Sequence, residues 1–188
     1  MPGPAAAAAT MLRRQFRFPL SLGTDICNIP RIRRILDGPQ RDRFIRRVLL
    51  PEERGRVYNY LNTTTPGQAP SQAAAKGSDV ELGRRKAAEF MAGRFAAKEA
   101  VIKAHPHLRI SFEDITIVSR QPDHHPRGVG DAAVVNASGG GPPVALIRHA
   151  EDGREVVQEA LLSISHDADY STAVCMGMTA GGWIGGEN

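Results

Sequence analysis

Cysteine, aromatic residues and long apolar runs are all scarce in this sequence. Its only cysteines, Cys27 and Cys175, lie far apart in apolar segments, so we expect buried, reduced thiols, and neither a disulfide framework nor a cysteine metal site is indicated. Aromatic residues make up 5% of the chain and no groove-reading motif is present, which disfavours nucleic acid as a partner. No apolar run approaches the roughly 20 residues that span a bilayer, so no membrane partner is expected.

Acidic residues are missing from the start of the chain. No Asp or Glu precedes Asp25, whereas Arg13, Arg14 and Arg17 lie in or near an Ala-rich segment. This composition is typical of a mitochondrial presequence, although serine is scarce, and a disordered extension is the alternative. We therefore expect residues 1–16 to be an N-terminal extension of a mitochondrial protein, with a cytoplasmic location as the second hypothesis.

Basic residues exceed acidic ones in the chain as a whole. The net charge is +4 and the pI is about 9.4. Between Arg31 and Arg47 the arginines are opposed only by Asp37 and Asp42. This balance favours an anionic partner, and an acidic protein or a phosphorylated small molecule fits it as well as nucleic acid does.

The length and the low-complexity tracts indicate one domain with insertions. A chain of 188 residues with 41% hydrophobic content can bury a single core. We expect that domain to span residues 17–180. Tracts rich in small and polar residues predict flexible insertions at about 62–83 and 120–142, and residues 181–188 are expected to form a frayed tail.

Hydrophobic periodicity predicts a mixture of helices and strands. A strand is expected to start near Phe16 and to end near Asp25, followed by a helix that begins at Pro30 and is capped by Gly38. Further helices are predicted within 40–50, 52–61 and 84–104, and strands within 111–120, 132–136, 144–150, 160–166 and 171–179. The pattern predicts an α+β fold in which a small, mostly antiparallel sheet packs with one long helix.

The segment GRFAAKEAVIKA, residues 93–104, carries unexpected charge within the longest predicted helix. Glu99 and Lys103 are one helical turn apart, so they lie on the same helical face with Phe95. They are either a solvated pair that supports the helix, or a carboxylate and an ammonium at a site where a metal meets a phosphate.

Three separated motifs resemble the holo-acyl-carrier-protein synthase family of 4′-phosphopantetheinyl transferases. The first is GTDICNIPRI, in which Gly23, Asp25 and an Ile-x-Arg-Ile ending at Ile32 match the family pattern. The second is FAAKEAVIKA at residues 95–104, and the third is SISH at residues 163–166, with Tyr170 downstream. All three occur in the family's order.

The resemblance implies a 4′-phosphopantetheinyl transferase fold and a Mg²⁺-dependent enzyme that uses coenzyme A and an apo acyl carrier protein. It implies Asp25 and Glu99 as metal ligands and, with Lys103 beside the phosphates, as the catalytic set. Because Mg²⁺ is held by one or two carboxylates plus waters and phosphates, two protein ligands suffice. The short members of the family also imply a homotrimer with coenzyme bound between neighbours.

The same resemblance implies residues that contact coenzyme A. These are Arg94, Lys98, Lys103, Ser163, Ser165 and His166. For Arg94 a pair with Glu89 or Glu99 is the alternative, and for Lys98 simple solvation. Since strand residues alternate, Ser163 and Ser165 are expected to share one face of a strand and Ile164 the other.

Docking of an acidic carrier protein is predicted for the basic segment that follows Asp25. The expected docking residues are Arg31, Arg33, Arg34, Arg43 and Phe44, and the alternative for Arg33 and Arg34 is a solvated helix face. No general base toward the carrier serine is identified. Glu53 is a candidate that would act through water, but a solvated helix charge is the favoured interpretation.

Three other functions compete with this hypothesis. A small basic nucleic-acid-binding module would explain the arginines, but not Asp25, Glu99 and the SISH motif. A cytosolic enzyme of the same family could serve a multidomain synthase. An inactive scaffold protein is disfavoured because Asp25, Glu99 and Lys103 are all present.

Overall fold

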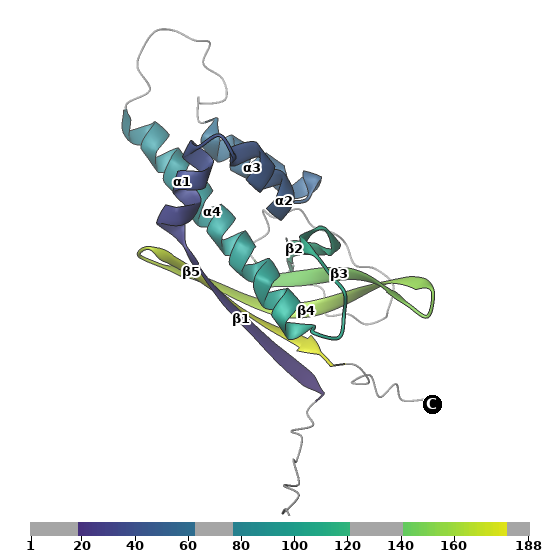
Figure 1. The fold of residues 1–188 in the computed structure, drawn as a ribbon. Coiled ribbons are helices and arrows are strands. Elements are labelled where there is room, and N and C mark those ends of the chain that lie inside the picture. Colours follow the sequence, from purple (N-terminus) through teal and green to yellow (C-terminus); the bar gives the residue numbers. More distant parts are fainter. Residues whose placement is uncertain (1–18, 63–76, 121–140, 180–188) are drawn as a thin grey trace, which may run out of the picture.

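The computed structural model describes residues 19–62, 77–120 and 141–179. Five antiparallel strands form one sheet in the order β1-β5-β4-β3-β2, and one long helix crosses one face of it (Figure 1). The strands are β1 (Leu20–Asn28), β2 (Ile115–Ser119), β3 (Pro143–Glu151), β4 (Arg154–Asp167) and β5 (Tyr170–Met178). The predicted α+β class, with an antiparallel sheet and a long helix, is confirmed.

Helices make up the second layer. α1 (Ile29–Asp37), α2 (Arg41–Val48) and α3 (Pro51–Leu61) follow β1 directly and pack around one end of α4 (Gly77–Ala104), as Figure 1 shows. A single 3₁₀ turn, η1 (Phe112–Asp114), precedes β2. No helix within the described ranges is long and apolar enough to cross a bilayer.

The first strand runs further than the sequence predicts. β1 continues past Asp25 to Asn28, because its backbone pairs with β5 through the register Asn28↔Tyr170. α1 then begins at once: the Asn28 side chain caps it by accepting a hydrogen bond from the backbone N–H of Arg31, and Pro30 lies in its first turn. The cap at Gly38 is confirmed. Asp25 therefore lies within the strand and not at its end.

α4 begins before the point that the sequence predicts. Residues 77–83 belong to the predicted flexible insertion, but they form the first turns of α4. Interactions with α1 explain this, because Glu81 pairs with Arg33 at 2.6 Å and Arg84 lies 3.9 Å from Asp37. The remainder of that insertion, the predicted strand at 132–136, the N-terminal extension and the tail lie largely outside the described residues.

Two further boundaries differ from the prediction. The segment before β2 is a 3₁₀ turn, since the Ser111 side chain accepts from the backbone N–H of Glu113 and Asp114 accepts from that of Ser111. β3 and β4 are longer than predicted because they form a hairpin whose two connecting residues, Asp152 and Gly153, both have positive φ (49° and 75°). Such a turn matches the twist of paired strands.

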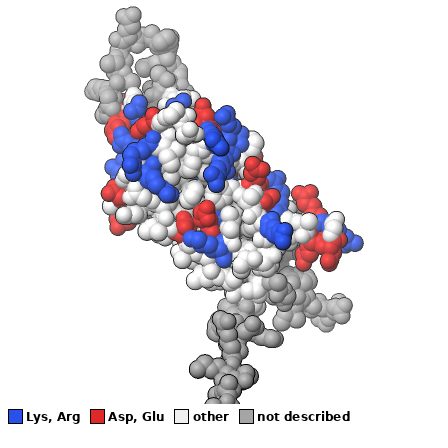
Figure 2. Space-filling view, in the orientation of Figure 1, with Lys and Arg blue, Asp and Glu red and all other residues white. Residues whose placement is uncertain are grey.

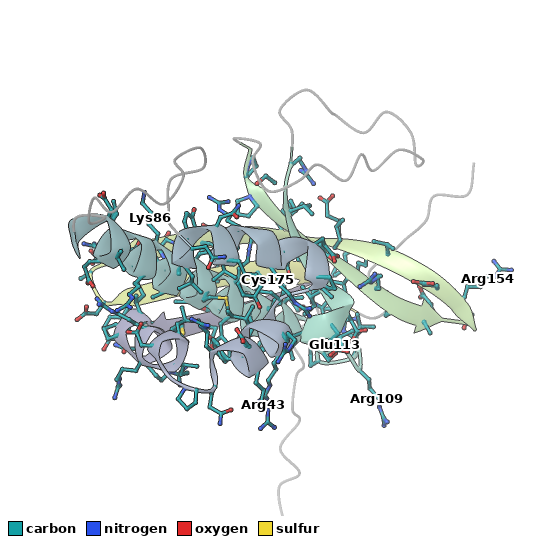
Figure 3. The ribbon with its side chains drawn as sticks, turned by 90° about the horizontal axis from the view of Figure 1, so that it is seen from above. Arg43, Lys86, Arg109, Glu113, Arg154 and Cys175 are labelled. Carbon is teal, nitrogen blue, oxygen red and sulfur yellow. The ribbon has the colours of Figure 1, made fainter. Side chains whose placement is uncertain are left out.

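The core lies between the sheet and α4. The helix contributes mostly small residues to it, and these are fully buried: Ala87, Ala88, Ala92, Ala96, Ala97, Ala100 and Ala104. Cys27 and Cys175 are buried and free, as predicted, and Cys175 lies inside the body in Figure 3. Small side chains on α4 bring its backbone close to β1 and β5, and this close approach positions the candidate site.

Candidate active site

The junction of β1 and the last turns of α4 brings three of the predicted residues together. Lys103 Nζ donates a hydrogen bond to Asp25 Oδ1 at 2.7 Å and another to the backbone carbonyl of Thr24 at 3.1 Å. Glu99 lies one turn before Lys103 on the same helix. The Asp25 side chain is 16% exposed and that of Lys103 is 50% exposed, so the junction opens to solvent.

Glycine at position 23 makes this junction possible. A Cβ there would overlap the carbonyl oxygen of Ala100 and crowd the backbone N–H of Ala104. β1 therefore crosses α4 at backbone contact, two residues before Asp25. The Ser21 hydroxyl donates to the carbonyl of Ala104 and holds the same crossing from the other side of Gly23.

The electrostatics of the junction keep Lys103 charged. The hydrogen bond with Asp25 raises the pKa of Lys103 above its usual value, and the negative charges of Asp25 and Glu99 contribute to the rise. Lys103 is therefore a cation throughout the neutral pH range. An ammonium beside two carboxylates can neutralise negative charge on a phosphorylated ligand without a change of protonation state.

The donor set fits a hard divalent cation. Asp25 and Glu99 present carboxylate oxygens near a solvent-open junction, and the described residues contain no group of three or more His, Cys, Asp or Glu side chains that could enclose a metal. A closed zinc-type site needs about four such ligands, whereas Mg²⁺ is held by one or two carboxylates with waters and phosphates. The residues present therefore fit Mg²⁺.

His166 lies on the same side of the sheet as Asp25. Asp25 of β1 is paired with Ala173 of β5, which is paired with Ile164 of β4. Paired residues, and residues two apart on one strand, point to the same side of a sheet. His166, two residues after Ile164, therefore points to the face that carries α4. Its ring rests against α4 at Gly93, where a Cβ would come within 2.9 Å of the imidazole Cε1. Gly93 is not among the predicted site residues, although a glycine in the middle of a predicted helix is a usual sign of close packing.

Ser163 and Ser165 face away from α4. Because Ile164 shares a face with Asp25, its two neighbours point to the opposite side of the sheet, and both are exposed. The predicted alternation of the two serines with Ile164 is confirmed. Within one chain, however, the fold does not bring them together with Asp25 and Glu99, and their contact with coenzyme A stays a prediction.

Lys98 and Arg94 are buried around Glu53. Lys98 is 0% exposed and donates to Glu53 Oε2 at 2.7 Å, so simple solvation was the wrong alternative for this lysine. The Nε atom of Arg94 lies 4.0 Å from Glu53 Oε1, and the guanidinium lies 5.1 Å from the centre of the Phe90 ring. The acidic partner of Arg94 is therefore Glu53, and not Glu89 or Glu99. Burial lowers the pKa of both cations, and Glu53 opposes that effect.

The favoured interpretation of Glu53 as a solvated charge was wrong. Its side chain is 5% exposed and accepts hydrogen bonds from Lys98 and from the backbone N–H groups of Leu50 and Ile117. These three hydrogen bonds and the burial commit the carboxylate to the packing of the helices and the sheet. Periodicity could have indicated its burial, because Glu53 precedes the buried Val57 by one turn of α3.

The five predicted docking residues lie on α1 and α2 but differ in their surroundings. Arg31 and Arg34 are exposed and line a pocket of ≈ 350 Å³ with Ile35 and the turn 38–40. Arg33 pairs with Glu81, which raises the pKa of Arg33, so much of its charge is already compensated. Figure 3 shows Arg43 pointing away from the body. Lys and Arg side chains gather over this helical end in Figure 2.

An aromatic pair links the docking residues to α4. The Phe44 ring stacks on Phe95 with centroids 6.2 Å apart, and the Arg31 guanidinium lies 5.8 Å from the centre of the Phe95 ring. Phe95 is one turn before Glu99, so the basic helices and the Asp25–Lys103 junction share one edge of α4. The sequence predicts Phe95 on this face but gives no sign of its contact with Phe44.

The open face of the sheet is apolar. Large hydrophobic side chains alternate outward on three adjacent strands, β1, β5 and β4: Leu20, Leu22, Ile26, Tyr170, Val174, Met176, Val157 and Leu161. No described helix covers this face. Contiguous exposed apolar surface of this kind marks an interaction site in a folded protein.

Comparisons with known proteins match most of the chain. The family model described as the 4′-phosphopantetheinyl transferase superfamily matches residues 21–175. A holo-[acyl-carrier-protein] synthase of Myxococcus xanthus is 34% identical over 157 residues, which are 81% of this chain and 89% of the relative. A protein of Aspergillus fumigatus named 4′-phosphopantetheinyl transferase B, mitochondrial, is 29% identical over 164 residues, 86% of this chain and 95% of the relative.

A solved structure shows the same fold. An acyl carrier protein synthase of Plasmodium yoelii with ADP bound superposes with a TM-score of 0.50 at 22% sequence identity, covering 85% of this chain and 95% of that one. The sheet with its long crossing helix is therefore an architecture that this solved structure shares.

Proposed function

The chain belongs to the 4′-phosphopantetheinyl transferase superfamily and is an enzyme of the holo-acyl-carrier-protein synthase type, and we propose that it transfers 4′-phosphopantetheine from coenzyme A to a serine of an apo acyl carrier protein. The observation that carries the assignment to this site is the meeting of Asp25 with Lys103, one turn from Glu99. These are the residues in which the first two sequence motifs match the family.

The reaction is a displacement at phosphorus. The hydroxyl oxygen of the carrier serine forms a bond to the β-phosphorus of coenzyme A as the pyrophosphate P–O bond breaks, adenosine 3′,5′-bisphosphate leaves, and the hydroxyl proton passes to solvent. Positioning and charge neutralisation carry most of the catalysis in such a step. Lys103 neutralises charge on the phosphates, and Asp25 orients Lys103 through their hydrogen bond.

Asp25 and Glu99 would hold Mg²⁺, and a bound Mg²⁺ would supply positive charge to the phosphate oxygens and the leaving group. The support is chemical: two carboxylates and an ammonium at a solvent-open junction suit a cation that shares its coordination with phosphates. Chelation of divalent cations by EDTA should therefore abolish transfer, and added Mg²⁺ should restore it.

We assign the coenzyme contacts to Lys103 and His166 on the α4 side of the sheet and to Ser163 and Ser165 on the other side. Arg94 is also assigned to the coenzyme, but it is buried beside Glu53 and would have to turn outward to make that contact. The two serines reach the coenzyme only if it binds between copies of the chain, because they face away from Asp25. Lys98 is fully buried against Glu53, so a direct contact between Lys98 and coenzyme A would require that pair to open.

We propose that three copies assemble through the apolar face of β1, β5 and β4. The exposed large hydrophobic residues on those strands support a subunit interface. A closed ring would cover this face with neighbouring subunits, whereas a monomer exposes it. The family resemblance favours three copies, and light scattering of an active sample measures the number.

We propose a mitochondrial enzyme that serves the carrier protein of fatty acid synthesis. The acid-free N-terminal segment and the similarity to the Aspergillus fumigatus mitochondrial protein both support this location. Import into isolated mitochondria, with shortening of the chain on import, tests it. A full-length chain that stays outside would favour the cytosolic hypothesis.

One incubation tests the proposed activity. The purified protein is mixed with coenzyme A, Mg²⁺ and an apo acyl carrier protein, and the carrier is analysed by mass spectrometry. We expect a mass increase of one phosphopantetheine group on one serine, and adenosine 3′,5′-bisphosphate in equal amount. Unmodified carrier after prolonged incubation with fresh, folded enzyme would refute the proposed activity.

A further inference from the structure

The interior of the helical layer contains a buried ion pair, Glu53 with Lys98, that takes no direct part in the proposed reaction. Glu53 of α3 accepts from Lys98 Nζ at 2.7 Å, and Lys98 also donates to the carbonyl of Phe112 at 3.2 Å. The other Glu53 oxygen accepts from the backbone N–H of Ile117 at 3.4 Å. One carboxylate and one ammonium thus tie together α3, α4, η1 and β2.

Burying this ion pair stabilises the packing of α4 less efficiently than apolar side chains would. Two charges taken out of water lose hydration that their attraction only partly replaces, and apolar side chains of similar size often stabilise a protein as well or better. Lys98 is nevertheless fully buried, and Glu53 nearly so. What such a pair provides and an apolar pair does not is a single permitted geometry.

Small side chains make most of the contacts between α4 and the sheet. Toward the sheet the helix presents mainly alanine, for example Ala96, Ala100 and Ala104, and short side chains interlock weakly with a neighbouring surface. The contact of Gly23 with Ala100 sets how closely β1 approaches α4. Charged, directional contacts of α4 include Lys103 with Asp25 toward β1 and, on a different side of the helix, Lys98 with Glu53 toward α3.

Lys98 is adjacent in sequence to the reactive stripe of α4. Glu99 follows it by one residue, or about 100° around the helix, and Lys103 by five. A rotation of α4 by about 20° would move a side chain at the helix surface by about 2 Å, given a helix radius of about 5–6 Å. A displacement of about 1 Å at a reacting group can lower a rate by about 100-fold.

We propose that Glu53 and Lys98 are positioning residues: their buried pair sets the rotation of α4 so that Glu99 and Lys103 meet Asp25. This inference rests on the proposed function only for its kinetic consequence. The structural claim is that the carboxylates of Asp25 and Glu99 can bind one metal ion together only while the Glu53–Lys98 pair joins α3 to α4.

The test replaces the pair by neutral side chains of similar size. In the double variant Glu53→Gln/Lys98→Met, the single amide oxygen at position 53 can accept from only one of the backbone N–H groups of Leu50 and Ile117, and the hydrogen bond from Lys98 of α4 is gone. Glu89→Gln is the matched control, because it removes a carboxylate from the exposed pair with Arg85 on the same helix. For each protein we would measure the melting temperature, kcat, both KM values and the Mn²⁺ dissociation constant by electron paramagnetic resonance with coenzyme A present.

We expect the double variant to fold cooperatively with a lower melting temperature, because one backbone N–H loses its acceptor, while kcat falls about tenfold or more and Mn²⁺ binds several-fold more weakly. The KM for the carrier protein should change little, since the docking residues lie on other helices, whereas the KM for coenzyme A should rise because Lys103 lies on α4. The control should match the wild type in all measurements. If the double variant folds poorly, Glu53→Asp provides the test. It keeps both charges but shortens the side chain by one methylene. We expect it to lower kcat and the affinity for Mn²⁺ as well.

Unchanged kcat and Mn²⁺ affinity in the folded double variant or in Glu53→Asp would overturn the proposal, whatever happens to the melting temperature, because the pair would then only stabilise the fold. The metal measurement also separates this inference from the proposed function. A wild-type protein without transferase activity refutes the function, whereas the comparison of Mn²⁺ affinities still supports or overturns the positioning role.

Discussion

Lys103 of α4 and Asp25 of β1 are 78 residues apart in sequence, and their charged atoms lie 2.7 Å apart in the fold. The pair joins the end of the long helix to the edge strand of the sheet, at the point where Gly23 lets the two backbones touch. Two motifs that are unremarkable alone therefore form one charged site. That site, the surfaces around it and the packing that brings its parts together can each be tested by substitution.

Replacing either predicted metal ligand should nearly abolish transfer. Asp25→Ala and Glu99→Ala each remove a carboxylate from the site, and a loss of about 3 kcal/mol of transition-state stabilisation, or about 10²–10³ in kcat, is typical for one strong electrostatic group. Steady-state kinetics at saturating Mg²⁺ measure the effect, and circular dichroism checks the fold. Wild-type turnover in either variant would remove that residue from the site.

Reversing the charge of Arg31 should weaken use of the carrier protein much more than use of coenzyme A. Arg31→Glu puts a negative charge where an acidic carrier is expected to dock, so we expect its KM to rise about tenfold or more. Arg154→Glu is the control, because Arg154 is exposed at the far end of the β3–β4 hairpin (Figure 3).

The salt dependence of docking provides a second measurement on the wild type. Added salt should raise the KM for the carrier, because exposed charges are screened beyond about 8–10 Å at physiological ionic strength. Arg33→Gln should mainly affect stability, since Arg33 already pairs with Glu81. Equal changes in both KM values, or no effect of salt, would contradict a docking role for this surface.

A methyl group at position 23 should separate β1 from α4. Gly23→Ala places a Cβ against the backbone of Ala100, and overpacking of this kind costs about 1–3 kcal/mol of unfolding free energy. Gly55→Ala is the opposite case: Gly55 is exposed within α3 with open space around it, so alanine should add up to about 1 kcal/mol. Urea denaturation at one protein concentration compares the two. Equal stability of both variants would contradict the close packing.

Acid should destabilise the fold through His105. This side chain is fully buried beside Gly177, with Nδ1 2.7 Å from the Val101 carbonyl. Burial lowers the pKa of His105 below its usual value, and the nearby His107 and His149 add to the decrease. The unfolded chain then binds a proton that the folded chain does not, so this contribution to stability is complete above about pH 6.5 and declines as the pH falls below it.

The pH dependence of the unfolding free energy measures the contribution of His105. One group of this kind changes the unfolding free energy by at most about 1.4 kcal/mol per pH unit. Melting temperatures between about pH 7.5 and 5.5 should fall less steeply in His105→Gln than in the wild type, whatever the absolute stability of the variant. An identical slope in both proteins would show that His105 does not titrate on unfolding.

A charge on the open face of the sheet should prevent assembly. Val174 is 40% exposed in the middle of that face, so Val174→Glu should shift the mass measured by light scattering from three copies to one and lower activity strongly. Val80→Glu is the control, because Val80 is similarly exposed at 39% but lies on α4. A fully active monomeric wild type would refute the trimer.

Local patterns were sufficient for the fold class and for the residues of the two main motifs. The alternation of β5 and the helical spacing of α1 follow from which side chains must leave water, and the Ser-Ile-Ser alternation follows from the two-residue period of a strand. Motif order alone predicts Asp25, Glu99 and Lys103 as site residues, and the fold adds the contact between Asp25 and Lys103. Boundaries were less accurate, because the end of β1 and the start of α4 depend on partners distant in sequence, Tyr170 and Arg33.

Only the tertiary structure determines which charged side chains are buried and which partners they have. Glu53 and Glu99 both lie on predicted helices beside other charges. Helical spacing relates Glu53 to the buried Val57 but does not identify its partners, and packing places Glu53 between two cations while Glu99 stays near solvent. Arg31 and Arg33 differ in the same way, since only Arg33 meets an acidic partner. Sequence determines which groups can ionise and which faces must be covered, whereas the pairing of a charge depends on the long-range packing that brings distant elements together.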